Sequence, residues 1–293
     1  MDIVFLNGEY VSQDRAVISA DDRGFTFGDG VYEVTPLFGG RALRMDARLA
    51  RLRFGLEALR IDYDTAGVES IYAELLSRNG LSDARSAIVY LQVTRGAARR
   101  THAFPPAGTR PTVYAYAESL PVCRYSEWEA GTRATTVSDS RWGRVDIKTL
   151  QLLPNVLAQE EARREGSDEA ILIRDGIALE GARNNLFAVV EGVLRSHPPS
   201  NQILCGISRQ LVLEVARERG YQVRELPTTR DQLGEATEVF LTGSTSGIRP
   251  IVSVDGVAVG DGRVGPVSRD LYDGFLSKIS EECEIDLRDP ASR

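Results

Sequence analysis

Residues 145–154 read VDIKTLQLLP, and this segment carries Lys148, one of only two lysines in a chain whose other basic side chains are arginines and two histidines. Arginine supplies a fixed charge, whereas lysine can lose its proton and become a nucleophilic amine. Lys148 is therefore a candidate for Schiff-base chemistry. From this residue alone, the alternative is a surface lysine that has escaped the bias toward arginine. The other lysine, Lys278, lies near the carboxyl terminus.

Composition narrows the classes of protein to be considered. The chain has 293 residues, enough for two domains, with a net charge of -7 and a pI near 5.1. This charge disfavours a nucleic-acid or anionic-membrane partner. The start, MDIVFLNGEYVS, lacks the apolar run of a signal peptide or a spanning helix. We expect a cytoplasmic protein.

Cysteine and histidine are too sparse for a disulfide framework or a metal centre. Cys123, Cys205 and Cys283 are widely spaced without a CxxC pair, which favours reduced thiols. His102 and His197 are the only histidines, so we expect no metal site.

The first 119 residues predict an N-terminal α+β domain. Asn7-Gly8 is typical of a tight β-hairpin turn. Leucines spaced by three and four predict a helix over 46–60 with Asp46 as N-cap, and a second helix is expected over 68–77. Residues 86–96 and 111–119 are β-branched and aromatic, as in strands.

An interdomain linker is expected at 120–131, followed by a C-terminal domain at 132–293 that carries Lys148. The expected helices are 154–164, one that begins with Ser208 as N-cap and ends at Gly220, and one after Pro266. The expected strands lie around Thr135 and at 170–173, 186–190 and 239–242, with a hairpin at Asp255-Gly256. Residues 260–265, GDGRVG, match a dinucleotide motif but precede a single remaining helix, so they indicate a turn.

Several elements suit a bound phosphate. Arg51 lies off the leucine stripe of its helix and is expected to point toward a ligand. A helix that begins after Gly206 offers unpaired N–H groups, and the small-residue loop LTGSTSG at 241–247 offers more donors. Each is more often structural than functional. Together with Lys148 and the carboxylate-bearing segment LEGARNN at 179–185, they are explained by pyridoxal phosphate.

The order of these motifs resembles the aminotransferase class IV family, the fold-type IV pyridoxal-phosphate enzymes. Within it, the arginine-x-histidine pair Arg100 and His102 is most similar to that of the D-amino acid aminotransferases. Branched-chain aminotransferases, aminodeoxychorismate lyase and (R)-selective amine transaminases share the scaffold and are the alternatives. The motifs are DRGFTFGDGVYEV, Arg51, QVTRGAARRTHAFP, DIKTLQLL, EGARNNLF, HPPSNQILCGISR and GPVSRDL.

The resemblance implies a two-domain α+β fold, in which a smaller N-terminal α/β domain precedes a larger domain with a barrel-like sheet and flanking helices. It places pyridoxal 5'-phosphate in the cleft between the domains of a homodimer, whose site borrows a loop from the partner. Lys148 would hold the cofactor as a Schiff base and shuttle the proton. The implied cofactor-binding residues are Arg51, Lys148, Glu180, Leu204, Ile207, Ser208, Ser244 and Thr245, and the implied carboxylate-binding residues are Tyr32, Arg100 and His102.

The activity implied is transamination of D-amino acids, of the D-alanine or D-glutamate type, with a 2-oxo acid as acceptor. Two departures from the family pattern affect side-chain specificity. Arg183 stands where small residues are common, and Gly247 stands where glutamate is common. We therefore include Arg183 among the candidate substrate-binding residues, with pairing to a neighbouring protein carboxylate as the alternative. Outside enzymes, the alternative is a silent protein that binds the cofactor.

Overall fold

The computed structural model describes residues 2–121 and 124–287, and Cys123 lies outside them. The chain divides into two compact units. Unit 1 contains residues 2–121, 147–151 and 283–285, and unit 2 contains 124–146, 152–282 and 286–287. The division falls inside the predicted linker.

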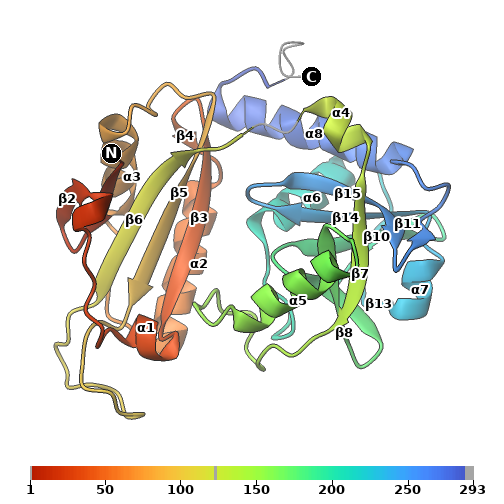
Figure 1. The fold of residues 1–293 in the computed structure, drawn as a ribbon. Coiled ribbons are helices and arrows are strands. Elements are labelled where there is room, and N and C mark those ends of the chain that lie inside the picture. Colours follow the sequence, from red (N-terminus) through yellow and green to blue (C-terminus); the bar gives the residue numbers. More distant parts are fainter. Residues whose placement is uncertain (1, 122–123, 288–293) are drawn as a thin grey trace. The chain divides into compact units, whose positions relative to one another are not determined.

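Unit 1 is an antiparallel sheet in the strand order β2-β1-β6-β5-β3-β4, with two helices packed on one face (Figure 1). Apolar residues of α2 and α3 meet alternate residues of β5, such as Val89, Leu91 and Val93, to form the core. The elements are β1 (Ile3–Leu6), β2 (Glu9–Ser12), a 3-10 turn (Gln13–Arg15), α1 (Arg23–Phe27), β3 (Gly30–Phe38), β4 (Arg41–Ala42), α2 (Met45–Leu59), α3 (Val68–Arg78), β5 (Ser86–Thr94) and β6 (Thr112–Ser119).

The local predictions for unit 1 are confirmed except at one helix cap. Asn7 and Gly8 have φ values of 51° and 99° and connect β1 to β2, as the hairpin prediction requires. The prediction of Asp46 as N-cap is wrong, because α2 begins at Met45 and its N-cap is Arg44 with φ of 56°. Asp46 lies instead in the first turn, where its charge complements the helix dipole.

The segment around Lys148 pairs with β3 of unit 1. Tyr32 N donates to Lys148 O at 3.1 Å and Leu150 N donates to Gly30 O at 3.1 Å. Val31 and Thr149 form an antiparallel bridge between these two bonds. The sequence prediction assigned Lys148 to the C-terminal domain, whereas its backbone hydrogen bonds group residues 147–151 with unit 1.

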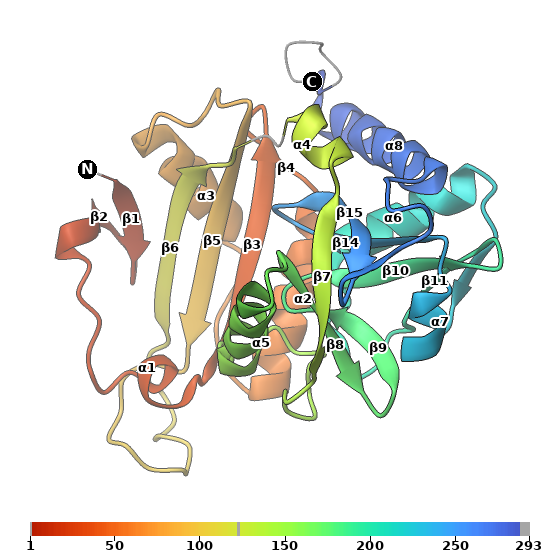
Figure 2. The ribbon, with the colours of Figure 1, turned by 45° about the vertical axis from the view of Figure 1, so that its right-hand side comes forward.

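Unit 2 is a closed six-stranded barrel with four strands attached to it. The ring follows the order β10-β14-β15-β7-β8-β9, and a single residue pair, Asn185 with Glu180, closes it by joining β9 to β10. Figure 2 shows β7, β8 and β9 as neighbouring strands. The strands are β7 (Thr132–Ser138), β8 (Glu169–Arg174), β9 (Ile177–Gly181), β10 (Asn185–Val190), β11 (Val193–Ser196), β12 (Val223–Glu225), β13 (Thr228–Thr229), β14 (Glu238–Gly243), β15 (Gly247–Val254) and β16 (Val257–Ala258).

The barrel-like sheet predicted for the larger domain is thus confirmed. A β-bulge in β9 then decides which way Glu180 faces. Opposite β8, Ala178 pairs with Ile173 but Glu180 pairs with Leu172, so Leu179 is the extra residue. A bulge reverses the alternation of side chains beyond it. Ala178 therefore joins the apolar barrel core, while Glu180 lies on the outer face.

The helices predicted in unit 2 are present, but the N-cap predicted for one of them is wrong. The N-cap of α6 is Gly206, so the prediction of Ser208 as N-cap is wrong and Ser208 lies in the first turn. The predicted linker contains a short helix, α4, whose Trp128 is buried and donates to Ile248 O at 2.8 Å. The helices are α4 (Tyr125–Glu129), α5 (Leu153–Arg164), α6 (Ile207–Glu218), α7 (Arg230–Gly234) and α8 (Pro266–Cys283).

Candidate active site

In unit 1, the Lys148 amine contacts the ring of Tyr32, and the next residue of β3 is a buried glutamate held by arginines. The Lys148 Nζ atom is 4.0 Å from the centroid of the Tyr32 ring. The neighbouring Glu33 is buried and accepts hydrogen bonds from Arg51 Nη2 at 2.6 Å and Nε at 3.0 Å, and from Arg48 Nη1 at 3.3 Å. Burial opposes the charge of Glu33, but Arg51, Arg48 and Lys148 together lower its pKa.

Arg51, which the sequence predicts to point toward a ligand, is paired with Glu33 in the structure. Two of its nitrogens are bound to Glu33, because residue 51 lies on the side of α2 that faces β3. The paired geometry fixes the guanidinium in place. Its assignment to the cofactor phosphate remains a prediction.

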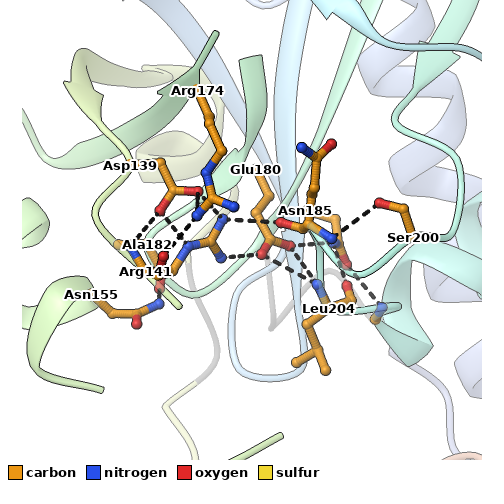
Figure 3. A network of polar contacts seen from close by, with 11 residues as sticks. Asp139, Arg141, Asn155, Arg174, Glu180, Ala182, Asn185, Ser200 and Leu204 are labelled. Carbon is orange, nitrogen blue, oxygen red and sulfur yellow. Dashed lines mark hydrogen bonds and ion pairs between the residues drawn. The ribbon is translucent and has the colours of Figure 1, made fainter. Parts of the chain in front are cut away.

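In unit 2, Glu180 is the centre of a second buried network (Figure 3). Arg141 Nη1 contacts one carboxylate oxygen, Asn185 Nδ2 donates to the other at 2.8 Å, and Leu204 N lies 3.2 Å from it. Burial raises the pKa of Glu180 to about 7, although Arg141 and the Leu204 N–H act in the opposite direction. Arg141 also binds Asp139 at 2.8 Å, so its charge is shared between two carboxylates.

Asn185 connects this carboxylate to the start of α6. Its Nδ2 atom donates to Leu204 O at 2.7 Å, and its Oδ1 atom accepts from Gly206 N at 3.0 Å. A side chain at residue 206 would collide with that amide, since an added Cβ would lie 2.1 Å from Asn185 Oδ1. The glycine therefore allows Glu180 and the helix N-terminus at Ile207 and Ser208 to approach each other.

The row of polar residues continues onto β14. Thr242 pairs with Asn185 across the strands, which puts both side chains on one face of the sheet. Its buried Oγ1 atom has no hydrogen-bond partner among the described residues. Ser244 and Thr245 form the turn that follows, between β14 and β15. The sequence-predicted residues Glu180, Leu204, Ile207, Ser208, Ser244 and Thr245 are all in unit 2.

The predicted carboxylate-binding residues are all in unit 1. Arg100 and His102 are exposed, and both side chains lie against the ring of Phe27. Tyr32 instead contacts Lys148 and stacks on Tyr90 at 5.6 Å between ring centroids. The structure thus brings Arg100 and His102 together, and it brings Tyr32 to Lys148.

Arg183 lies near a protein carboxylate, which is the alternative considered for it. Its Nη2 atom is 3.7 Å from Oε1 of Glu169, a fully buried residue, and its side chain is 65% exposed. Arg249 Nη1 lies 3.4 Å from the same oxygen. A substrate contact for Arg183 remains a prediction.

Five residues of these networks were not singled out from the sequence: Glu33, Arg48, Asp139, Arg141 and Asn185. Glu33 directly follows the predicted Tyr32, and Asn185 belongs to the LEGARNN segment. Their proximity to these motifs could have identified both residues from the sequence. Arg141 is distant in sequence from Glu180, and no spacing rule connects them.

The described residues, 2–121 and 124–287, contain no group of three or more His, Cys, Asp or Glu that could hold a metal ion. Within the same ranges, no helix has both the length and the apolar character needed to cross a membrane.

Comparison with known proteins assigns the scaffold. Residues 30–254 match the family model for amino-transferase class IV. The D-alanine aminotransferase of Staphylococcus haemolyticus is 37% identical over 94% of this chain and 97% of its own length. That of Bacillus licheniformis is 37% identical over 95% of this chain and 98% of its own.

Solved structures agree on the fold. The branched-chain amino acid aminotransferase of Escherichia coli is 29% identical with a TM-score of 0.88, over 98% of this chain and 97% of that one. The branched-chain amino acid aminotransferase of Thermoproteus uzoniensis, solved with norvaline, is 26% identical with a TM-score of 0.84, over 96% and 95% of the two chains. A further branched-chain enzyme, solved with pyridoxamine 5'-phosphate, is 27% identical with a TM-score of 0.89, over 96% and 95% of the two chains.

Proposed function

Because the chain belongs to the class IV aminotransferases, which use pyridoxal 5'-phosphate, we propose that it transfers the amino group of D-amino acids to a 2-oxo acid such as pyruvate or 2-oxoglutarate. One observation carries the choice of substrate. Arg100 and His102 both contact the ring of Phe27, with Arg100 Cζ at 5.1 Å and the His102 ring centroid at 5.7 Å from its centroid, and we assign one substrate carboxylate to this guanidinium and imidazole. Relatives of similar length named D-alanine aminotransferase support the same choice.

The residues present suit the cofactor. Burial raises the pKa of Glu180 to about 7, so too little positive charge lies nearby to stabilise its ionised form fully. A protonated ring nitrogen would supply that charge. The first N–H groups of α6 at Ile207 and Ser208 are oriented as donors for a phosphate, and the turn at Ser244 and Thr245 adds hydroxyls. We assign Arg51 to the phosphate and Leu204 to the ring side of the site through its bond to Glu180.

When bound, the cofactor supplies an electron sink for the carbanion formed at the substrate α-carbon. Lys148 would provide the amine that holds the cofactor and a base for the α-proton of the substrate. Glu180 would hold a proton on the ring nitrogen. Arg100, His102 and Tyr32 hold the carboxylate so that the α-hydrogen faces Lys148.

A homodimer in the cytoplasm completes the proposal. Leu153, Val156 and Leu157 are exposed on one side of α5, spaced by three and four residues. Such an apolar stripe is typical of a protein interface. Sedimentation analysis should give a dimer, and Leu157→Glu should weaken it. The acidic net charge, which disfavours an anionic-membrane partner, favours the cytoplasm.

A second activity is favoured by the similar solved structures described above, which are branched-chain aminotransferases. An (R)-amine transaminase is the other alternative, although it would have no use for a carboxylate-binding pair. Purified protein should be incubated with D- and L-amino acids and (R)-1-phenylethylamine, each with 2-oxoglutarate, and the products separated by chiral chromatography. Preference for the amine or for an L-branched-chain amino acid over every D-amino acid would replace the proposed function.

A further inference from the structure

The ring of Phe27 supports both side chains that we assign to the substrate carboxylate. Arg100 Cζ lies 5.1 Å from the ring centroid, and the centroid of the His102 ring lies 5.7 Å away. A further side chain, the cationic Arg23, places its Cζ 4.6 Å from the same centroid. Cations are attracted to the negative face of an aromatic ring, so these contacts hold Arg100 near a fixed point.

Arg23 also holds the backbone on both sides of His102. Its Nη1 atom donates to Thr101 O at 2.8 Å and approaches Ala103 O at 3.4 Å. The Nε atom donates to Asp29 at 2.8 Å, and the whole arginine is buried. One guanidinium therefore connects the loop, the Phe27 ring and an internal carboxylate.

Asp29 extends this anchor to the end of the loop. Arg95 binds both oxygens of Asp29, at 2.8 and 2.9 Å, and its Cζ lies 3.8 Å from the ring centroid of Phe104. Burial opposes the charge of Asp29, but Arg95 and Arg23 lower its pKa, so the anchor keeps its charges. Residues 101–104 are thus held at both ends.

The helix that carries Phe27 is itself fixed to the sheet. Asp22 caps α1 by accepting from Gly24 N at 2.8 Å and also accepts from Thr94 Oγ1 at 3.0 Å. An added Cβ at Gly24 would lie 2.3 Å from Thr94 Cγ2, so the glycine allows α1 to pack against β5. The support under the loop is therefore a part of the folded sheet.

We propose that Phe27 and Arg23 are positioning residues that hold Arg100 and His102 at the spacing a substrate carboxylate requires. The inference rests on the proposed role of that pair in substrate binding. Phe27 and Arg23 act through the loop, so their loss weakens substrate binding more than the chemical step.

Steady-state kinetics with D-alanine tests this role. Phe27→Leu removes the aromatic face and should raise KM about two- to fivefold, with a smaller change in kcat. In an Arg100→Ala background the same substitution should change KM by a clearly smaller factor. Phe25→Leu is the matched control, because Phe25 lies on the same helix and is 79% exposed, and its KM should equal that of the wild type. An equal factor in both backgrounds would overturn the proposal.

Limited proteolysis separates this inference from the proposed function. Trypsin cleavage after Arg99 and Arg100 in the holoenzyme should be faster in Arg23→Gln and Phe27→Leu than in Phe25→Leu. If Arg23→Gln does not fold, Arg23→Lys can be used instead, because it keeps the charge but loses the guanidinium that donates to several acceptors at once. Unchanged cleavage rates in all these variants would overturn the positioning role. Faster cleavage in a protein that transaminates no D-amino acid would overturn the proposed function and leave the positioning role standing.

Discussion

Glu33 in unit 1 and Glu180 in unit 2 are both buried beside arginine, yet their pKa values shift in opposite directions. Three cationic residues, Arg51, Arg48 and Lys148, act on Glu33 and lower its pKa despite burial. The cation that acts most strongly on Glu180 is Arg141, which is shared with Asp139, so burial prevails and the pKa rises to about 7. The balance of nearby charges, and not depth of burial, decides whether such a carboxylate keeps its charge. Glu33 is therefore suited to be a permanent structural anion. Glu180 is suited to pair with a protonated group, such as the ring nitrogen of the cofactor.

The largest expected effect is on Lys148, which stands beside Glu33. Lys148→Arg keeps the positive charge but cannot act as the amine, so turnover should fall to nearly zero while the fold is retained. Lys278→Arg is the control, because Lys278 only pairs with Glu214 and Glu218 at the surface. Borohydride reduction and peptide mapping should place the cofactor on Lys148. A label on Lys278, or none, would contradict the assignment.

The next effect concerns the carboxylate of unit 2. Glu180→Gln keeps the size and planar shape of the side chain but removes the charge that holds a proton on the ring nitrogen. Single-turnover removal of the α-proton should slow by orders of magnitude, with cofactor still bound. Absorbance of the bound cofactor measures retention, and stopped-flow kinetics measures the step. An unchanged single-turnover rate would show that Glu180 does not serve the ring nitrogen.

Sequence patterns predicted the regular elements better than the contacts between them. Helix α3 and the strands β5 and β10 follow from local periodicity and side-chain type. The bulge at Leu179, which turns Glu180 to the outer face, depends on pairing with β8 and has no local signal.

The same limit applies to the site. The residues alone made Lys148 and Arg51 candidates and the resemblance added Glu180, but the pairing of Arg51 with Glu33 depends on how α2 packs against β3. The predicted caps at Asp46 and Ser208 were each misplaced by two residues, because the true N-caps, Arg44 and Gly206, make no side-chain capping bond.

The opposite pKa shifts predict opposite effects of pH on stability after removal of the cofactor. The pKa of Glu180 is raised in the folded state, so its contribution is present below pH 4.5 and is lost as the pH rises through 7, by on the order of 3 kcal/mol. The pKa of Glu33 is lowered, so its contribution is present above pH 4.5 and is lost as the pH falls. Denaturant unfolding of the wild type, Glu180→Gln and Glu33→Gln at a series of pH values from below 4.5 to above 7 measures the contribution of each glutamate to the free energy of unfolding. If the free-energy differences between the wild type and the two variants change in the same direction with pH, the predicted opposition between Glu33 and Glu180 is refuted.

The smallest effect is expected at Arg183, where a third buried carboxylate, Glu169, resembles Glu180. Burial raises the pKa of Glu169, and Arg183 and Arg249 act against the rise. Because Arg183 is mostly exposed and Arg249 would remain, Arg183→Ala should change stability by no more than about 0.5 kcal/mol. If Arg183 binds a second substrate carboxylate, kcat/KM should fall selectively for D-aspartate and D-glutamate, by about tenfold or more. D-Alanine is the internal control, since it has no second carboxylate. An equal loss on D-alanine would leave Arg183 as a partner of Glu169 with no part in specificity.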